Sequence, residues 1–98
     1  MTPEQLHDLE RRGWRLTRDG STATAYLAWD DPDDPDSGWE LLVLHTAGHG
    51  ARFTLNVSES GLTERSPADA GRLLAGLSGA AELLDGWTGE LPDEGEEQ

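Results

Sequence analysis

Residues 14–29, WRLTRDGSTATAYLAW, decide the fold of this chain. Two runs that alternate apolar and polar residues flank Asp19-Gly20, and this dipeptide is typical of two-residue hairpin turns. The pattern therefore predicts two antiparallel strands, 14–18 and 21–29, with Leu16 opposite Ala23.

This pairing divides the side chains between two faces, because successive strand residues point to opposite sides of a sheet. The apolar face is predicted to carry Trp14, Leu16, Ala23, Ala25, Leu27 and Trp29. The other face is predicted to carry Arg15, Thr17, Thr22, Thr24 and Tyr26. We expect the apolar face to form the core.

A short helix is predicted before the hairpin. Thr2-Pro3-Glu4-Gln5 combines an N-cap, a proline suited to the first helical position, and the residue that completes a capping box. Gly13 is expected to end this helix.

Two more strands are predicted after the hairpin. Residues 30–38 hold two prolines and five aspartates, so we expect them to form a loop. Trp39 to Thr46 contains four successive apolar residues, which indicates a central strand that is apolar on both faces. Ala51 to Val57 alternates and predicts the fourth strand.

The last predicted element is a second helix. Ser66-Pro67 begins it by the same cap-and-proline logic, and Asp85-Gly86 ends it. Its apolar residues recur with helical periodicity. Because its glycines weaken a helix by about 1 kcal/mol each relative to alanine, we expect a bend or break near Ser78-Gly79.

The predicted fold class is α+β: an N-terminal helix, a four-stranded antiparallel meander and a C-terminal helix, with both helices on one sheet face. Residues 1–89 form the single predicted domain, and residues 90–98 an acidic disordered tail. The outline is similar to that of small αβββα-type bacterial domains, including some immunity proteins and secretion chaperones, in architecture and not in any motif.

Negative charge is concentrated in two stretches. The chain carries twenty acidic residues against seven arginines and no lysine, for a net charge of −13. Residues 30–36 and residues 90–98 each hold five of these carboxylates. Such a focused field attracts basic partners and repels nucleic-acid backbones and anionic membranes, so we expect no direct contact with either.

Composition also narrows the chemistry. The chain has no cysteine, which excludes disulfides and thiolate catalysis and favours a cytoplasmic location. No signal peptide and no apolar run long enough to span a membrane is evident. No glycine-rich phosphate loop or nucleophile elbow is present, so we expect no cofactor and no enzymatic activity.

Two features suggest metal sites, and neither is specific. The aspartate-rich loop offers oxygen ligands for calcium, but its prolines break the spacing of a calcium-binding loop. His45 and His49 have helical metal-ligand spacing but lie at a strand end and in a glycine turn, and a third ligand is missing. We therefore assign no metal site.

The predicted functional site is the sheet face opposite the helices, together with the acidic loop. If both helices cover one face, the leucines of the third strand that point the other way lack a cover, and exposed apolar residues on a sheet favour an interface. The predicted partner-binding residues are Tyr26, Asp30, Asp31, Asp33, Asp34, Asp36, Leu42, Leu44 and Arg52.

The sequence thus favours a small acidic protein-binding module that acts as an inhibitor, immunity protein or adaptor on a protein partner. The negative charge favours a basic partner. A homodimer through the same face is an alternative. A second alternative is a DNA-mimic inhibitor of a nucleic-acid enzyme, of the anti-restriction or anti-CRISPR type. A small hydrolase or metal-dependent enzyme is the third and least favoured.

Overall fold

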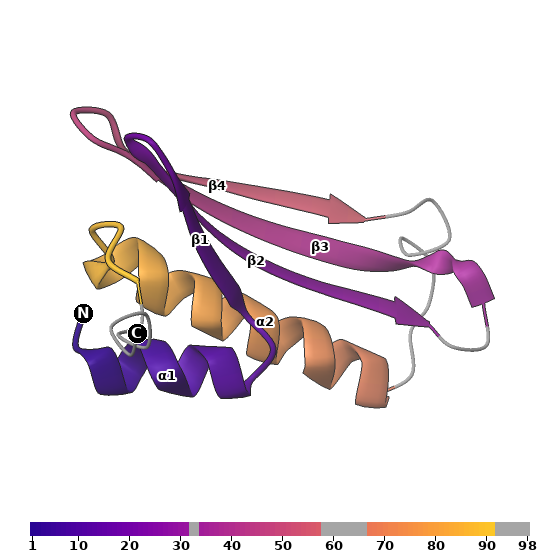
Figure 1. Cartoon of the computed structure of the whole chain (residues 1–98). Helices are drawn as coiled ribbons and strands as arrows, with labels where there is room; N and C mark the ends of the chain where they lie inside the picture. Colours follow the sequence, from indigo (N-terminus) through magenta and orange to yellow (C-terminus); the bar gives the residue numbers. More distant parts are fainter. Residues whose placement is uncertain (32–33, 58–66, 92–98) are drawn as a thin grey trace.

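The computed structural model describes residues 1–31, 34–57 and 67–91. The elements follow in the order α1 (Pro3–Arg11), β1 (Arg15–Asp19), β2 (Thr22–Asp31), β3 (Asp34–Thr46), β4 (Gly50–Val57) and α2 (Pro67–Gly86). The strands form one antiparallel sheet in the order β1-β2-β3-β4. Both helices lie on one side of it, with α2 packed against β3 and β4 (Figure 1). The predicted α+β class and topology are confirmed.

The start of α1 follows from its first residues. The Thr2 side chain accepts a hydrogen bond from the backbone N–H of Gln5 at 3.2 Å, and the Gln5 side chain accepts from the backbone N–H of Thr2 at 2.8 Å. This reciprocal capping box satisfies two N–H groups that have no partner within the helix. Leu6 and Leu9 are the buried residues of α1.

The register of the first hairpin differs from the prediction by two residues. Asp19 pairs with Thr22 and Leu16 with Ala25, so the turn residues are Gly20 and Ser21. Gly20 has φ +63°, and a type II′ turn requires glycine at this position. Because a shift of two residues keeps every side chain on its own face, the predicted face assignment still holds.

The predicted loop at residues 30–38 is wrong in its extent. β2 continues to Asp31 and β3 begins at Asp34, with a register shift between Asp30, which pairs with Gly38, and Asp31, which pairs with Asp34. Among the described residues, this part of β3 pairs with β2 alone, since β4 begins its pairing at Trp39. A strand segment beside a register shift tolerates the proline that a regular central strand excludes.

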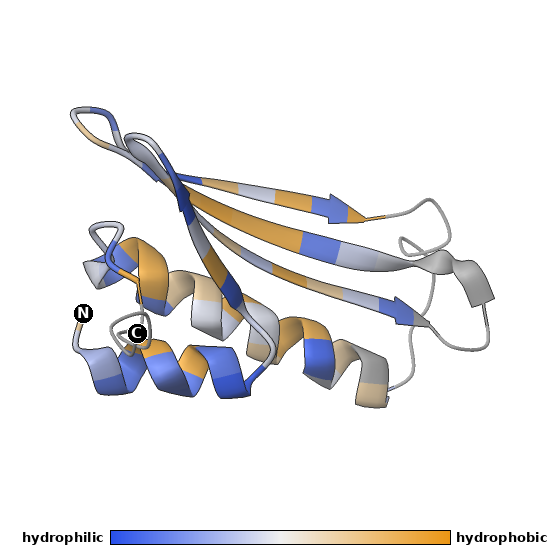
Figure 2. Cartoon of the chain, in the orientation of Figure 1, coloured by the Kyte–Doolittle hydropathy of each residue, from blue (hydrophilic) through white to orange (hydrophobic). Residues whose placement is uncertain are grey.

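The core lies between the sheet and the two helices. The fully buried residues include Leu41 and Val43 from the sheet, Leu9 from α1 and Leu83 from α2. The middle of β3 is apolar along a continuous stretch (Figure 2). Leu41 and Val43 point toward the helices, whereas Leu42 and Leu44 point away, as expected for a strand that is apolar on both faces.

Helix α2 is continuous from Pro67 to Gly86, so the expected break near Ser78-Gly79 is wrong. Its central glycines serve close packing. A Cβ added at Gly76 would lie 2.9 Å from Leu41 Cδ1, and one added at Gly79 would lie 2.7 Å from Trp14 Nε1. The glycines thus let the helix backbone approach the sheet more closely than any side chain would permit.

The chain after α2 folds back over the helix side of the sheet. Trp87 is buried, its ring meets the edge of the His45 ring, and its Nε1 donates to the Glu90 carbonyl at 2.7 Å. Arg18 donates to the Gly89 carbonyl at 2.8 Å. The chain is described as far as Leu91, and the remaining residues of the predicted tail, 92–98, lie outside the described residues.

Glycine-to-alanine substitutions in α2 are expected to have opposite effects at two positions. Gly79→Ala should lower the free energy of unfolding by about 1–3 kcal/mol, because the new methyl group overlaps Trp14. Gly71→Ala should raise it by about 0.5–1 kcal/mol, because alanine favours the helix and its Cβ meets no atom within 4 Å.

Urea denaturation of both variants measures this difference. The interpretation of Gly79 as a packing residue would be wrong if both variants were stabilised equally.

Candidate functional site

The sheet face opposite the helices brings four of the predicted site residues together. Tyr26 lies directly opposite Leu42, and Leu44 lies between Thr24 on β2 and Arg52 on β4. Tyr26, Leu42 and Leu44 are half-buried by their neighbours on the sheet, and Arg52 is exposed. Neither helix covers this face (Figure 1). We call these four residues the open-face cluster.

Charged residues surround the open-face cluster. Strand alternation places Glu40, opposite Ala28, and Asp30, opposite Gly38, on this face near the hairpin that joins β2 to β3. Arg15 lies opposite Tyr26 on β1. Acidic groups therefore lie toward the end of the face that holds the β2–β3 hairpin, and arginines lie on the two edge strands.

The structure gives side-chain placement for only one of the predicted aspartates. Asp30 is exposed at the end of β2. Asp31, Asp34 and Asp36 lie in strand backbone whose side chains are not described, and Asp33 lies outside the described residues. The part of the acidic stretch that the structure describes is thus continuous with the sheet.

The histidines do not gather into a metal site. Among the described residues, no group of three or more histidines and carboxylates is close enough to hold a metal ion. His45 packs against Trp87 on the helix side, and His7 lies 3.4 Å from Glu10 on α1.

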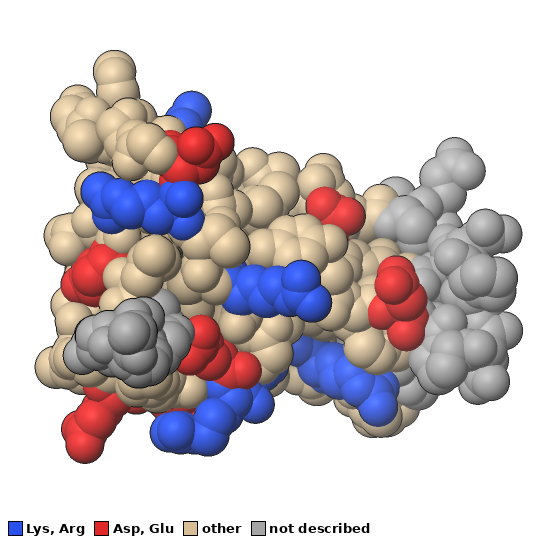
Figure 3. Space-filling model, in the orientation of Figure 1, with Lys and Arg blue, Asp and Glu red and all other residues tan. Residues whose placement is uncertain are grey.

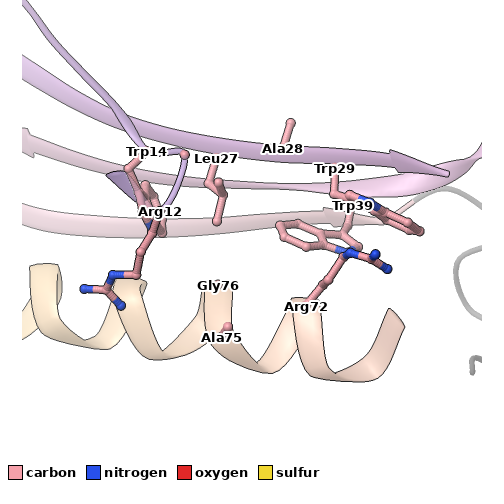
Figure 4. Close-up of a pocket in the computed structure, with 10 residues that line it drawn as sticks. Arg12, Trp14, Leu27, Ala28, Trp29, Trp39, Arg72, Ala75 and Gly76 are labelled. Carbon is pink, nitrogen blue, oxygen red and sulfur yellow. The ribbon is translucent and has the colours of Figure 1, made fainter. Parts of the chain in front are cut away.

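A groove that the sequence analysis missed lies on the helix side, between the connection from α1 to β1, the strands β2 and β3, and the first half of α2. Its volume is about 430 Å³. The described lining residues are Arg12, Gly13, Trp14, Leu27, Ala28, Trp29, Trp39, Arg72, Ala75 and Gly76. In the close-up, Leu27 and Trp39 extend toward α2, with Arg12 and Arg72 at opposite ends (Figure 4).

Both arginines of this groove already contact groups of the chain. Arg72 stacks on the Trp29 ring, with its guanidinium carbon 5.2 Å from the ring centroid, a cation–π distance. Arg12 lies 3.1 Å from carboxylate oxygens of both Glu82 and Asp8. Its hydrogen bond to Glu82, with the nearby negative charge, raises the pKa of Arg12 further above its ordinary value.

The groove is built for contact with apolar or planar groups. Trp29 and Trp39 lie with ring centroids 6.4 Å apart, and the buried indole N–H of Trp39 has no hydrogen-bond partner among the residues that the structure describes. The described lining includes no carboxylate, imidazole or hydroxyl group that would serve as nucleophile or general base. Four tryptophans in 98 residues were the only signal in the sequence, and they do not specify how the rings are arranged.

Comparison with known proteins finds no relative. No family model matches the chain, and no curated protein or solved structure does so either. No helix in the described part of the chain is long and apolar enough to cross a membrane.

Glu90 fixes the end of the described chain through its carboxylate. Oε2 lies 3.0 Å from the N-terminal ammonium of Met1, and Oε1 accepts hydrogen bonds from the Thr88 backbone N–H and hydroxyl at 2.7 and 3.0 Å. Burial raises the pKa of Glu90, but the hydrogen bonds from its own backbone N–H, Met1 and Thr88 outweigh burial and hold that pKa at about 2.

Glu90→Gln is therefore expected to destabilise the fold in a pH-dependent manner. The folded pKa lies below the unfolded value, so the carboxylate stabilises the fold above about pH 4.5 and this contribution disappears as the pH falls toward 2. After allowance for solvent screening, the loss at pH 7 should be about 1 kcal/mol.

Urea denaturation of wild type and variant at pH 7, 4.5 and 3 measures the effect. The difference in unfolding free energy should fall to about half or less by pH 3. A difference that stays constant across this range would contradict the assigned role of the carboxylate.

Proposed function

We propose that this protein is a small non-enzymatic binding module that inhibits or adapts a basic protein partner through the open-face cluster. The observation that carries the proposal is the register of Tyr26 against Leu42. It centres an apolar patch on a sheet face that neither helix covers. A tyrosine beside leucines supplies the apolar and aromatic contact that holds protein interfaces together.

Charge supports a basic partner. The chain has a net charge of −13, and Asp30 and Glu40 lie on the same face as the open-face cluster, by strand alternation. Opposite charge accelerates encounter, and the apolar centre then slows dissociation. The partner surface that fits is therefore an apolar patch bordered by lysine or arginine side chains.

The DNA-mimic alternative receives less support. A mimic needs carboxylates in rows that replace phosphates, and the described Asp and Glu side chains are interspersed with arginines on the side shown in Figure 3. Such a mimic would lose affinity steeply as salt rises, whereas an apolar interface with a charged border loses little. The enzymatic alternative also receives less support, because the described lining of the groove includes no carboxylate, imidazole or hydroxyl group.

Adjacent leucines on opposite faces provide the test. Leu42→Ala should leave folding nearly intact but weaken binding at least about tenfold, as for a central interface residue. Leu41→Ala removes a fully buried side chain and should cost about 2–5 kcal/mol of stability, with little effect on the affinity of the folded fraction. Tyr26→Ala should behave like Leu42→Ala.

The measurement is capture of the partner on immobilised wild-type protein, followed by calorimetric titration of the purified partner with each variant. Wild-type affinity in both Leu42→Ala and Tyr26→Ala would refute the open-face cluster as the binding surface.

A further inference from the structure

A second apolar surface lies at the other edge of the sheet, on the helix side. Phe53 and Leu55 belong to the covered face of β4, yet they remain 40% and 39% exposed. The strand order makes β4 an edge strand. Side chains that strand alternation assigns to the core are thus left open to solvent.

Helix α2 extends this surface. Gly79 faces Trp14 and Leu9, which lie toward α1. At about 100° per residue, Leu77 and Leu84 lie roughly 140–160° around the helix from Gly79, on the flank away from α1. Leu77 is half-buried and Leu84 is 42% exposed. We call Phe53, Leu55, Leu77 and Leu84 the β4 flank.

The edge of β4 lacks the devices that prevent strand pairing. Residues 50–57, GARFTLNV, contain no proline and no lysine, and Arg52 is their one charged residue. Protected edges usually carry charges, prolines or bulges, because an open edge presents unpaired N–H and C=O groups along its length. β4 pairs with β3 without a register shift along its whole length.

We infer that the β4 flank is the interface of a symmetric homodimer in which β4 pairs antiparallel with β4 of a second copy. Pairing across a twofold axis at Thr54 places Phe53 opposite Leu55 of the second copy, and Ala51 opposite Val57. Every helix-side residue from 51 to 57 then faces an apolar residue. An axis at Phe53 would instead leave Val57 opposite His49.

The same axis determines the position of the helices. It runs perpendicular to the sheet, so both copies of α2 stay on one side of a continuous eight-stranded sheet. The leucines of the two β4 flanks then converge below the joined strands. The open-face cluster of each copy stays on the opposite side, so this dimer leaves the proposed partner surface accessible.

Charge favours a second copy over the basic partner at this edge. None of the chain's twenty carboxylates lies in β4, so the strand itself carries no group that attracts lysine or arginine side chains. Two copies with a net charge of −13 each repel one another at a distance. Added salt screens that repulsion and should strengthen the dimer, whereas it weakens attraction to a basic partner.

Sedimentation equilibrium of the full chain tests the dimer. A single strand pair of eight residues gives an interface at the small end of the stable range, so we expect a dissociation constant on the order of 10 µM in 0.1 M salt, decreasing in 0.5 M salt. A chain that stays monomeric at about 200 µM, well above this constant, in both salts would overturn the inference.

Two residues with the same exposure provide matched variants. Phe53→Lys should weaken dimerisation at least about tenfold, because it buries a charge opposite Leu55 of the second copy. Leu91→Lys, at a side chain that is also 40% exposed but lies off the β4 flank, should dimerise as wild type does. Circular dichroism and thermal unfolding confirm that each variant is folded. Unchanged dimerisation of folded Phe53→Lys would overturn the inference.

Cysteine crosslinking tests the register. The chain has no cysteine, and an axis at Thr54 brings the two copies of residue 54 within the Cα separation of about 4.4–6.8 Å that a disulfide needs. Thr54→Cys should therefore form a covalent dimer under mild oxidation. Thr17→Cys, at an exposed threonine on the opposite edge strand β1, should not. Equal crosslinking of the two variants, or none of Thr54→Cys, would overturn the proposed pairing.

Discussion

The close approach of α2 to the sheet is the constraint on which the rest of the structure depends. Gly76 lies against Leu41, Leu27 and Trp39, and Gly79 lies against Trp14 and Leu9. Because neither glycine carries a side chain, the rings of Trp14 and Trp39 pack directly against the helix backbone. This chain of 98 residues thus builds its core from tryptophans and leucines packed against a bare stretch of helix backbone.

This packing also determines which surfaces remain open. The bare face of α2 rests over β2 and β3, where Trp39 and Leu41 are buried. Helix α2 also contacts β4 but does not bury it, and Phe53 and Leu55 stay exposed. With both helices on one side, the opposite face keeps Tyr26, Leu42 and Leu44 as its apolar centre. The two proposed interfaces are therefore consequences of one packing arrangement.

The two surfaces differ in their electrostatic surroundings, and this supports different partners. The open-face cluster lies near Asp30 and Glu40, which favours a basic protein. The β4 edge carries no carboxylate, which favours a like-charged second copy that meets it through apolar contact. The two proposed contacts use different surfaces, so they would not compete with one another.

The sequence by itself determined the fold class, the caps of α1, the start of α2 and the face on which each residue of β2 as far as Trp29 lies. These features depend on residues close in the chain: a capping box, a proline at a first helical position, and alternation that survives a two-residue change in register.

The tertiary structure alone decided the rest. Local propensity treats a glycine as unfavourable in a helix. Only the tertiary structure shows that Gly79 lies against Trp14 and Gly76 against Leu41, where a side chain would not fit. The exposure of Phe53 and Leu55 was likewise hidden, because alternation predicts which face a residue lies on but not how far a helix extends across it. The groove around Trp29 and Arg72 was hidden for the same reason, since it depends on the distance between elements that are remote in the chain.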